Sequence, residues 1–275
     1  MNDLYVQWID NIPFKLKNPF DTEFIHKYGT VFKVFDGQDS GNLCFGVKDG
    51  DKRYFVKFAG APTEQYNGKI EDAILCLKSI VPVYRDLEHP NLIHFVKAEE
   101  IGGGFAAIFD WVDAECMGKQ YPLSHKKFMQ MPLEKKMGIF EDIVMFHIHV
   151  ARSGYVAIDF YDGSIMYDFE NDKTVICDID FYQKVPYYGD MGLWGSKRFI
   201  SPEEHTDGAV IDEVTNVYTM GATAFALFSD SNRNQEVWPL KKSLFDVVKK
   251  AVSDDRSKRQ QSIQQFLEEW RNARL

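Results

Sequence analysis

Cysteines are few in this sequence, and no two are spaced as metal-binding or redox motifs require. The 275 residues include four, Cys44, Cys76, Cys116 and Cys177, and none forms a CxxC pair. Disulfide-rich secreted folds and cysteine-based zinc sites are therefore disfavoured. Three of the four lie in apolar runs, so we expect buried, reduced thiols, as in a cytoplasmic protein.

Long apolar runs and a basic amino-terminal segment are also missing. The stretches 105–109 and 221–228 are apolar, but they are far shorter than the roughly 20 residues that a membrane-spanning helix needs. The first ten residues carry Asp3 and Asp10, where a signal peptide would need positive charge. We expect a soluble, cytoplasmic protein with no membrane partner.

Positive charge is in deficit. The 41 Asp and Glu residues outnumber the 32 Lys and Arg residues, which gives a formal net charge of −9. Such a surface is poorly suited to nucleic acid or to an anionic membrane, although a local basic pocket remains compatible with it. Hydrophobic residues make up 45% of the chain, which is enough for a sizeable core in one domain or two lobes.

Short β-strands are predicted through about the first 130 residues. They are expected at 30–36, 42–49, 52–59, 91–101 and 104–112. Asp49-Gly50 predicts a tight hairpin between the second and third of them. One helix interrupts the strands, with apolar residues at helical spacing from Ile70 to Tyr84, and Pro82 is expected to kink or divide it.

Helices dominate the rest of the chain. They are expected at 133–154, 210–228, 243–253 and 262–273. Between the first two, residues 155–184 are read as two short strands around a turn that contains Asp168 and Asp172. The prediction is an α+β fold in which a β-rich lobe (about 1–112) and a helical lobe (about 119–275) are joined by a hinge (about 110–118), with a cleft between the lobes as the ligand site.

Three charged residues each follow or end a predicted element, in a fixed order along the chain. Lys57 ends the strand RYFVKF, Asp159 follows a helix and a turn, and Asp178 follows the strand TVIC 19 residues later. This order resembles the V-A-I-K, H-R-D and D-F-G motifs of protein kinases. Four further segments are similar to kinase motifs and occur in the kinase order: EHPNLI (88–93), GSKRFISPEE (195–204), NVYTMG (216–221) and DRSKRQQS (255–262).

The resemblance implies a bilobal kinase-like fold and a divergent, bacterial-type Ser/Thr kinase that uses ATP and Mg²⁺. Lys57 would contact the α- and β-phosphates of ATP. Asp159 would orient the acceptor hydroxyl and take its proton, and Asp178 would bind the metal ion. Asp110 and Val112 would present backbone groups to the adenine, with Phe109 as the gatekeeper.

Other positions depart from the kinase pattern. Asp36 and Gln38 replace the first two glycines of the phosphate loop and leave Gly41, so we expect weak or altered ATP affinity. The glutamate that pairs with Lys57 is Glu71 or, alternatively, Glu64. The second metal ligand is Ser164 or Asp162, since both offer the hard oxygen that Mg²⁺ prefers.

The catalytic loop also lacks a charge that kinases use for regulation. Ile158 replaces the arginine that usually grips an activation-loop phosphate. We therefore predict that activity does not depend on phosphorylation of Tyr187, Tyr188 or Ser196. Tyr161 replaces the lysine that is common in Ser/Thr kinases.

Supporting roles are expected for a few more residues. Asn216 stands where a kinase Asp braces the catalytic loop, and Glu203 is predicted to form a structural ion pair with Arg259. Trp238 lies in a short connecting segment and is predicted to be exposed to a partner. Three functions remain open: a protein Ser/Thr kinase, a pseudokinase that binds without catalysis, and a small-molecule kinase, which Tyr161 favours.

Overall fold

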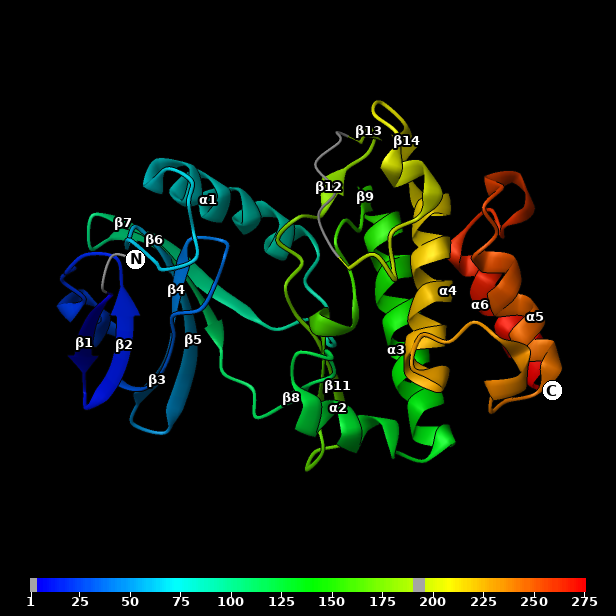
Figure 1. The fold of residues 1–275 in the computed structure, drawn as a ribbon, viewed down its shortest axis with the longest axis horizontal. Helices are drawn as coiled ribbons and strands as arrows, with labels where there is room; N and C mark the ends of the chain where they lie inside the picture. The colour runs from blue at the N-terminus through cyan, green and yellow to red at the C-terminus, as the bar shows by residue number, and fades with distance from the viewer. Residues whose placement is uncertain (1–3, 190–195) are drawn as a thin grey trace. The chain divides into compact units, whose positions relative to one another are not determined.

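The computed structural model describes residues 4–189 and 196–275 and shows an α+β protein with several antiparallel sheets (Figure 1). Its contacts divide it into two compact units. The first contains residues 1–88 and 93–113, and the second contains residues 89–92 and 114–275. Within the described ranges, no helix is both long and apolar enough to cross a bilayer.

A five-stranded antiparallel sheet forms the centre of the first unit, with the strand order β3-β4-β5-β7-β6. Its strands are β3 (Thr30–Phe35), β4 (Asn42–Asp49), β5 (Lys52–Ala59), β6 (Phe95–Ile101) and β7 (Gly104–Asp110). The five predicted strands are confirmed, but β6 begins four residues later than expected. Asn91 instead belongs to the second unit, where its carbonyl accepts a hydrogen bond from the backbone N–H of Ile176 at 2.6 Å.

An amino-terminal hairpin, which the sequence analysis missed, covers one face of this sheet. It consists of β1 (Tyr5–Ile9) and β2 (Ile12–Leu16) and is followed by a 3₁₀ helix, η1 (Glu23–Tyr28). Asp10 and Asn11 form its turn with φ values of 47° and 66°, as a tight hairpin turn requires. Phe14 and Leu16 are buried in a core shared with the sheet residues Phe45 and Val56.

Helix α1 (Ile70–Asp86) packs against the other face, where the Tyr84 and Phe109 rings lie 4.8 Å apart. The helix continues through Pro82 and does not divide there. Cys76 of this helix is exposed, so the prediction that it is buried was wrong: the helix turns Ala73, Leu77 and Ile80 toward the sheet instead.

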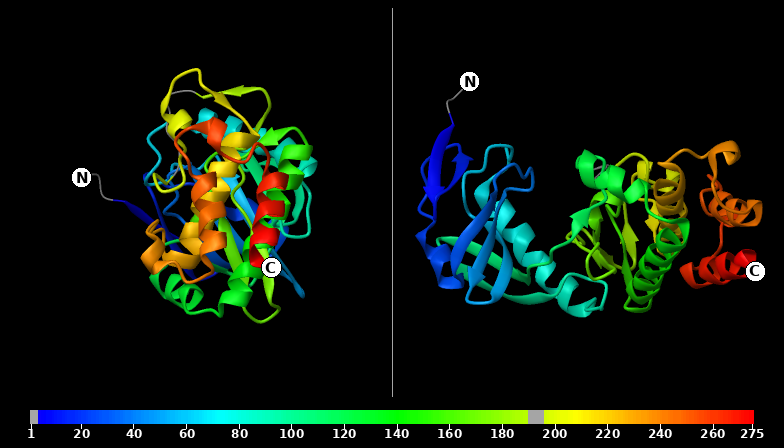
Figure 2. Two further views of the ribbon diagram at one scale, coloured as in Figure 1. Left: turned by 90° about the vertical axis from the view of Figure 1, so that its right-hand side faces the viewer. Right: turned by 90° about the horizontal axis from the view of Figure 1, so that it is seen from below.

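Five helices form the larger part of the second unit (Figures 1 and 2). They are α2 (Pro122–Met129), α3 (Leu133–Arg152), α4 (Glu213–Ser229), α5 (Lys242–Ala251) and α6 (Ile263–Arg274). Helix α4 lies between α3 and the α5–α6 pair and is buried from Thr215 to Phe228. Four of the five helices were predicted, and the short α2 was not.

Short strands complete the second unit. A small sheet has the order β11-β10-β8, and two further pairs join β9 to β12 and β13 to β14. The bounds are β8 (Glu115–Cys116), β9 (Tyr155–Val156), β10 (Ile165–Asp168), β11 (Lys173–Ile176), β12 (Gln183–Lys184), β13 (Tyr187–Tyr188) and β14 (Val210–Ile211). The predicted turn between β10 and β11 is confirmed: Asp168 accepts two backbone N–H bonds there, and Asp172 has a φ of 54°.

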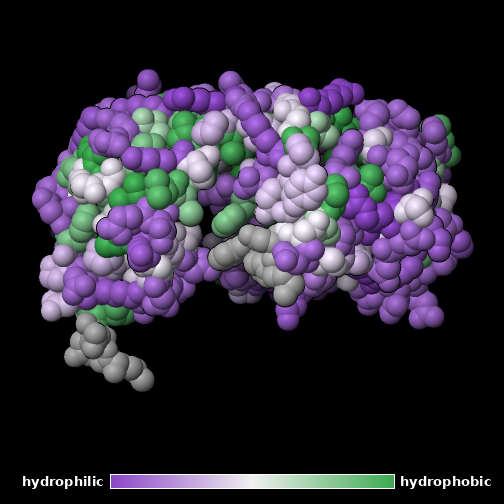
Figure 3. Space-filling model, turned by 90° about the horizontal axis from the view of Figure 1, so that it is seen from above, coloured by the Kyte–Doolittle hydropathy of each residue, from purple (hydrophilic) through white to green (hydrophobic). Residues whose placement is uncertain are grey.

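Trp238 is buried, so the prediction that it faces a partner was wrong. Its ring contacts those of Phe225, Phe228 and Phe245, with centroid distances of 5.5 to 5.9 Å. It therefore closes the apolar core between α4 and α5. On the face shown in Figure 3, the end of the second unit that carries α5 and α6 is almost entirely hydrophilic, whereas apolar patches interrupt the surface of the first unit.

Candidate active site

The loop that carries Asp159 is fixed by a buried amide of α4. The side chain of Asn216 is 2% exposed. Its Oδ1 accepts a hydrogen bond from the Ala157 backbone N–H at 2.7 Å, and its Nδ2 donates to the Ala157 carbonyl at 2.8 Å. Both backbone groups of Ala157 are thus held two residues before Asp159. This observation agrees with the bracing role predicted for Asn216.

Asp159 and Asp178 flank the β10–β11 hairpin in the same unusual backbone conformation. Their φ values are 59° and 57°. Left-handed residues other than glycine are uncommon, and such strain gathers at functional sites. The two loops are joined where the Cys177 N–H donates to the Ser164 carbonyl at 3.0 Å. The aspartates predicted from sequence therefore occupy adjacent loops of one unit.

The phenol of Tyr161 is within electrostatic range of both carboxylates. Burial raises the pKa of its phenol, and the nearby negative charges of Asp178 and Asp159 raise that pKa further. The ring lies over Gly163, where a Cβ would come within 2.3 Å of the ring carbon Cε2. Gly163 is thus required for Tyr161 to fold back across the turn η2 (Asp162–Ser164). The phenol stays neutral and can donate a hydrogen bond.

A buried imidazole supports the Asp178 loop from α3. Nδ1 of His147 lies 2.8 Å from the Ile143 carbonyl, which can only accept, so this nitrogen carries the proton. Nε2 then accepts from the Tyr182 hydroxyl at 2.9 Å. The His147 ring also packs against Phe160 with centroids 4.3 Å apart. His147, which the sequence analysis did not single out, therefore contacts a residue next to Asp159 and one that follows Asp178.

The two candidates for the second metal ligand differ in their surroundings. Ser164 is fully buried, and its hydroxyl has no hydrogen-bond partner among the residues described. Asp162 is 1% exposed, and each of its oxygens accepts a hydrogen bond from Arg198 at 2.8 Å. Ser164 therefore has an oxygen available for a cation beside the Asp178 loop. Both oxygens of Asp162 are already engaged by Arg198.

A metal ion can also be held by protein side chains alone. Among the described residues, no group of three or more His, Cys, Asp or Glu is placed to hold a metal ion. A magnesium ion at Asp178 and Ser164 would thus need oxygens from a bound phosphate or from water, as Mg²⁺ sites in phosphoryl-transfer enzymes commonly do. Both side chains offer the hard oxygen ligand that this ion prefers.

In the first unit, Lys57 lies in the middle of the sheet. Cys44 of β4 pairs with it on one side, and Ala107 of β7 pairs with it on the other. Two register positions along the strands, Gly46 and Phe55 occupy the same face. Lys57 is half-buried, and the strand holds its backbone rigidly, as the predicted phosphate contact requires.

Aromatic rings cover part of this sheet face. Phe32 lies 4.8 Å from Trp111, and Phe35 lies 5.7 Å from Phe55. Trp111 also lies 6.5 Å from Phe55. A Cβ at Gly46 would come within 2.9 Å of both Phe32 and Trp111, so this glycine admits the two rings. We call Phe32, Phe35, Phe55 and Trp111 the aromatic cluster; the sequence analysis did not identify it.

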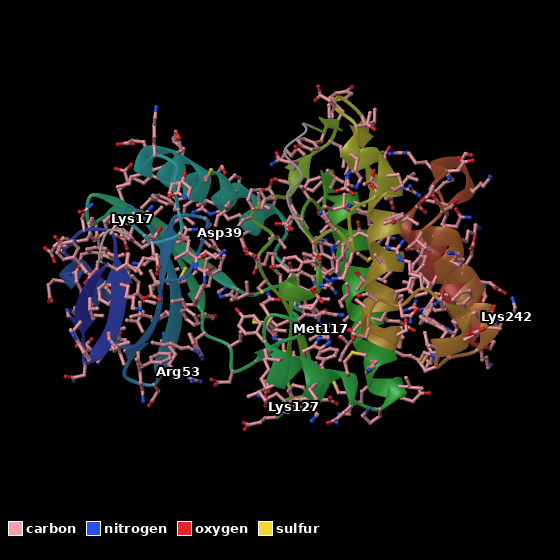
Figure 4. All side chains as sticks on the ribbon, viewed as in Figure 1. Lys17, Asp39, Arg53, Met117, Lys127 and Lys242 are labelled. Atoms are coloured by element: carbon pink, nitrogen blue, oxygen red, sulfur yellow. The ribbon has the colours of Figure 1, made fainter. Side chains whose placement is uncertain are left out.

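The loop that replaces the glycine-rich segment packs within its own unit. Gly41 has a φ of 82°, and a Cβ there would come within 2.8 Å of Ala73 in α1. The Asp36 carboxylate accepts the Lys15 backbone N–H at 2.7 Å. Figure 4 marks Asp39 in this loop, at the end of β4 opposite the β4–β5 turn. Gly41 therefore packs against α1, and Asp36 holds the backbone of β2, both within the first unit.

The remaining residues predicted for the nucleotide site also belong to the first unit. Glu71 occupies the first turn of α1, Glu64 precedes the helix, and both are exposed. The Asp110 N–H donates to the His94 carbonyl at 3.0 Å, and its carboxylate lies 2.7 Å from the His94 ring. Val112 is half-buried just after β7.

An ion pair predicted from sequence is confirmed in the second unit. The Arg259 guanidinium donates to both oxygens of Glu203 at 2.7 and 2.9 Å, and its side chain is fully buried. Burial alone would raise the pKa of Glu203, but the bonds from Arg259 outweigh this effect and hold the pKa below its usual value. Arg256, which was not predicted, also donates to Glu203 at 3.2 Å.

Comparison with known proteins adds no relative. The chain matches no protein-family model, and no curated protein matches it.

Proposed function

We propose that this protein is a phosphotransferase with a bilobal, kinase-like fold, which transfers the γ-phosphate of ATP to a hydroxyl in a magnesium-dependent reaction. A protein serine or threonine is the proposed acceptor. The observation that carries the proposal is the placement of Asp159 and Asp178. They flank one hairpin with the same left-handed backbone, and the loops that carry them are joined by the hydrogen bond from the Cys177 N–H to the Ser164 carbonyl.

The proposed chemistry divides between these residues. Asp159 would accept the proton of the acceptor hydroxyl, which makes that oxygen a better nucleophile. Asp178 and Ser164 would hold Mg²⁺, which when bound neutralises charge on the phosphate oxygens. Tyr161 would donate its phenolic hydrogen bond to a phosphate oxygen, in the place where many kinases use a lysine.

Nucleotide contacts belong to the first unit in this proposal. Lys57 would contact the α- and β-phosphates, with Glu71 as its carboxylate partner. Backbone groups of Asp110 and Val112 would pair with the adenine edge, and Gly41 would approach the phosphates. The packing of Gly41 against α1 supports only a weak contact.

A non-catalytic binding protein is the second candidate, and the aromatic cluster favours it. Four rings lie on the sheet face that carries Lys57. A nucleotide bound on this face would have to pack beside the four rings of the aromatic cluster. A third candidate, a small-molecule kinase, is favoured by Tyr161, because small-molecule kinases of this superfamily also lack the lysine.

Nucleotide binding is tested first by thermal unfolding. A ligand that binds only the folded chain raises the melting temperature, and at 100 times its Kd the stabilisation is about 2.7 kcal/mol. We expect a rise with ATP and Mg²⁺ together that Lys57→Met reduces. No shift at millimolar ATP would count against both kinase proposals and favour the non-catalytic one.

Catalysis is tested with γ-labelled ATP on panels of proteins and of small hydroxyl compounds. Asp159→Asn should lower kcat by about 100-fold or more, since general-base catalysis contributes 10²–10⁴-fold. Asp246→Asn, an exposed change in α5, serves as the matched control. Equal labelling by wild type and Asp159→Asn would remove Asp159 from its role, and the panel that accepts label decides between the two acceptor classes.

A further inference from the structure

Asp162 and Arg198 form an ion pair in the second unit, and its carboxylate is buried. The two guanidinium nitrogens of Arg198 each donate to one oxygen of Asp162 at 2.8 Å. The Asp162 side chain is 1% exposed, and that of Arg198 is 31% exposed. Two parallel charge-assisted bonds fix both the distance and the orientation of the partners. The pair therefore joins residues 196–200 to the turn η2 rigidly.

Neighbouring groups extend this connection to α4 and the residues after it. The same guanidinium donates to the Ser231 hydroxyl at 3.0 Å. The Arg198 backbone carbonyl accepts from Arg233 at 2.9 Å, and Arg233 in turn donates to the Tyr218 hydroxyl at 2.9 Å. Both the side chain and the backbone of Arg198 are thus held by groups of the second unit.

The pair sits beside the loop that carries Asp159. The ring centroids of Phe199 and Tyr161 lie 6.5 Å apart, and the guanidinium carbon of Arg198 lies 5.1 Å from the centroid of the Phe199 ring. Phe199 and Ser196 line one small cavity together with Asp159. Any movement of residues 196–200 would therefore change the walls around Asp159.

We propose that Asp162 takes the place of a regulatory phosphate: its carboxylate holds Arg198 so that residues 196–204 are ordered beside Asp159 without any added phosphate. Arg198 and Asp162 are positioning residues in this proposal. Its consequence for catalysis rests on the phosphotransferase function proposed above, whereas the ordering itself does not.

The charges of the pair are placed the opposite way from those in a phosphate-controlled segment. In a phosphate-controlled segment, added negative charge is gripped by arginine. Here the cation belongs to residues 196–200, and the anion is an aspartate of η2 that is always present. Ile158 supplies no cation next to Asp159. A permanent carboxylate thus does what a phosphate would do, and the link cannot be released by a phosphatase.

Amide hydrogen exchange of residues 196–204 tests the ordering, supported by the rate of tryptic cleavage after the exposed Lys197. Asp162→Asn keeps the shape but removes the charge. Breaking a buried pair leaves an uncompensated charge, so we expect exchange protection to fall on the order of 100-fold. Arg198→Lys, made in the wild-type chain, should lose less protection. It keeps the positive charge, although a single ammonium replaces a donor that makes two parallel hydrogen bonds.

Glu141→Gln is the matched control, since it breaks the Arg–carboxylate contact with Arg271 elsewhere in the second unit. It should leave residues 196–204 protected, and so should phosphatase treatment of the wild-type chain. Protection that survives in Asp162→Asn, or that phosphatase removes from the wild type, would overturn the proposal.

An activity measurement then separates positioning from the proposed reaction. Asp162→Asn should lower kcat at least tenfold while the KM for ATP changes less than twofold, because the proposed contacts with the adenine and with the α- and β-phosphates lie in the first unit and do not involve Asp162. An unchanged kcat with an opened segment would refute the positioning role. A wild-type chain that transfers no phosphate would refute the proposed function, while the exchange result still decides whether Asp162 orders the segment.

Discussion

The two units hold their candidate residues by different physical means. In the second unit, buried polar groups hold the loops: Asn216 bonds to the backbone of Ala157, and Arg259 bonds to the side chain of Glu203. In the first unit, Lys57 lies on a sheet whose face is shaped by packed aromatic rings. Hydrogen bonds and ion pairs specify one geometry, whereas apolar packing tolerates substitution more readily.

This difference bears on which function each unit supports. Directional braces are what a reacting centre needs, because small displacements of catalytic groups cost large factors in rate. The second unit has such braces around Asp159. The first unit offers a lysine and a cluster of rings, an arrangement equally suited to binding without catalysis. Substitutions in each unit test this difference.

The largest expected effect comes from Arg259→Leu in the second unit. The variant leaves the buried Glu203 carboxylate with much less compensation, and breaking a buried ion pair costs about 3–5 kcal/mol. Chemical denaturation should show this loss in the free energy of unfolding. Arg274→Leu is the control: it removes surface contacts with Glu134 and Glu141, for which about 1 kcal/mol or less is expected. Equal losses in the two variants would mean that burial of the pair does not matter.

Acid should weaken the second unit through His147. Burial lowers the pKa of this imidazole to about 4, below the value of about 6.5 in an unfolded chain. The unfolded state therefore binds a proton first as the pH falls. Stability is complete above about pH 6.5 and decreases toward pH 4, by about 3 kcal/mol in total. Hydrogen exchange measured at pH 7 and pH 5 should show this loss in peptides of α3.

A second imidazole contributes in the same direction. The pKa of His89 is lowered by burial and by His149.

The double variant His147→Phe with Tyr182→Phe tests the contribution of His147. It removes one polar pair and keeps the aromatic volume, so its stability should vary less with pH than that of the wild type. An unchanged pH dependence would assign the acid sensitivity to other groups.

The smallest effect is expected in the first unit, for Gly46→Ala. The added methyl would lie within 2.9 Å of Phe32 and Trp111, so the rings must move, at a cost of about 1–3 kcal/mol. The emission spectrum of Trp111 should change as its ring leaves the sheet. Gly37→Ala is the control for the loss of glycine alone, because an added methyl there meets only the Gln65 side chain, at 3.7 Å, and needs no left-handed backbone. If both variants behave alike, the rings do not depend on Gly46.

Local patterns were enough to predict most elements of the fold. Alternating apolar residues and the Asp49-Gly50 turn placed β4 and β5 to the residue. The β1–β2 hairpin was missed although Asp10-Asn11 is itself a turn signal. β6 was predicted too long because Asn91 pairs with a residue 85 positions later, and no local pattern reveals such a partner.

The contacts around the candidate site were harder to predict than single residues. Spacing singled out Asp159 and Asp178, which lie on adjacent loops, and correctly predicted the partner of Glu203. It could not show that Asp162 is held by Arg198, or that His147 bonds to Tyr182, because both contacts span more than 30 residues. Cys76 and Trp238 were misjudged for a related reason: which side of an element faces the core depends on packing that their neighbours in sequence do not reveal.

The Arg259–Glu203 pair also has a consequence for how the chain matures during translation. The strands β3, β4 and β5 pair with their neighbours in sequence, so this part of the first unit can assemble soon after it leaves the ribosome. The pair joins residues 56 positions apart, and Glu203 must stay without its main partner until Arg259 has been synthesised. The nascent chain therefore carries an ordered first unit long before the loops around Asp159 acquire their final support.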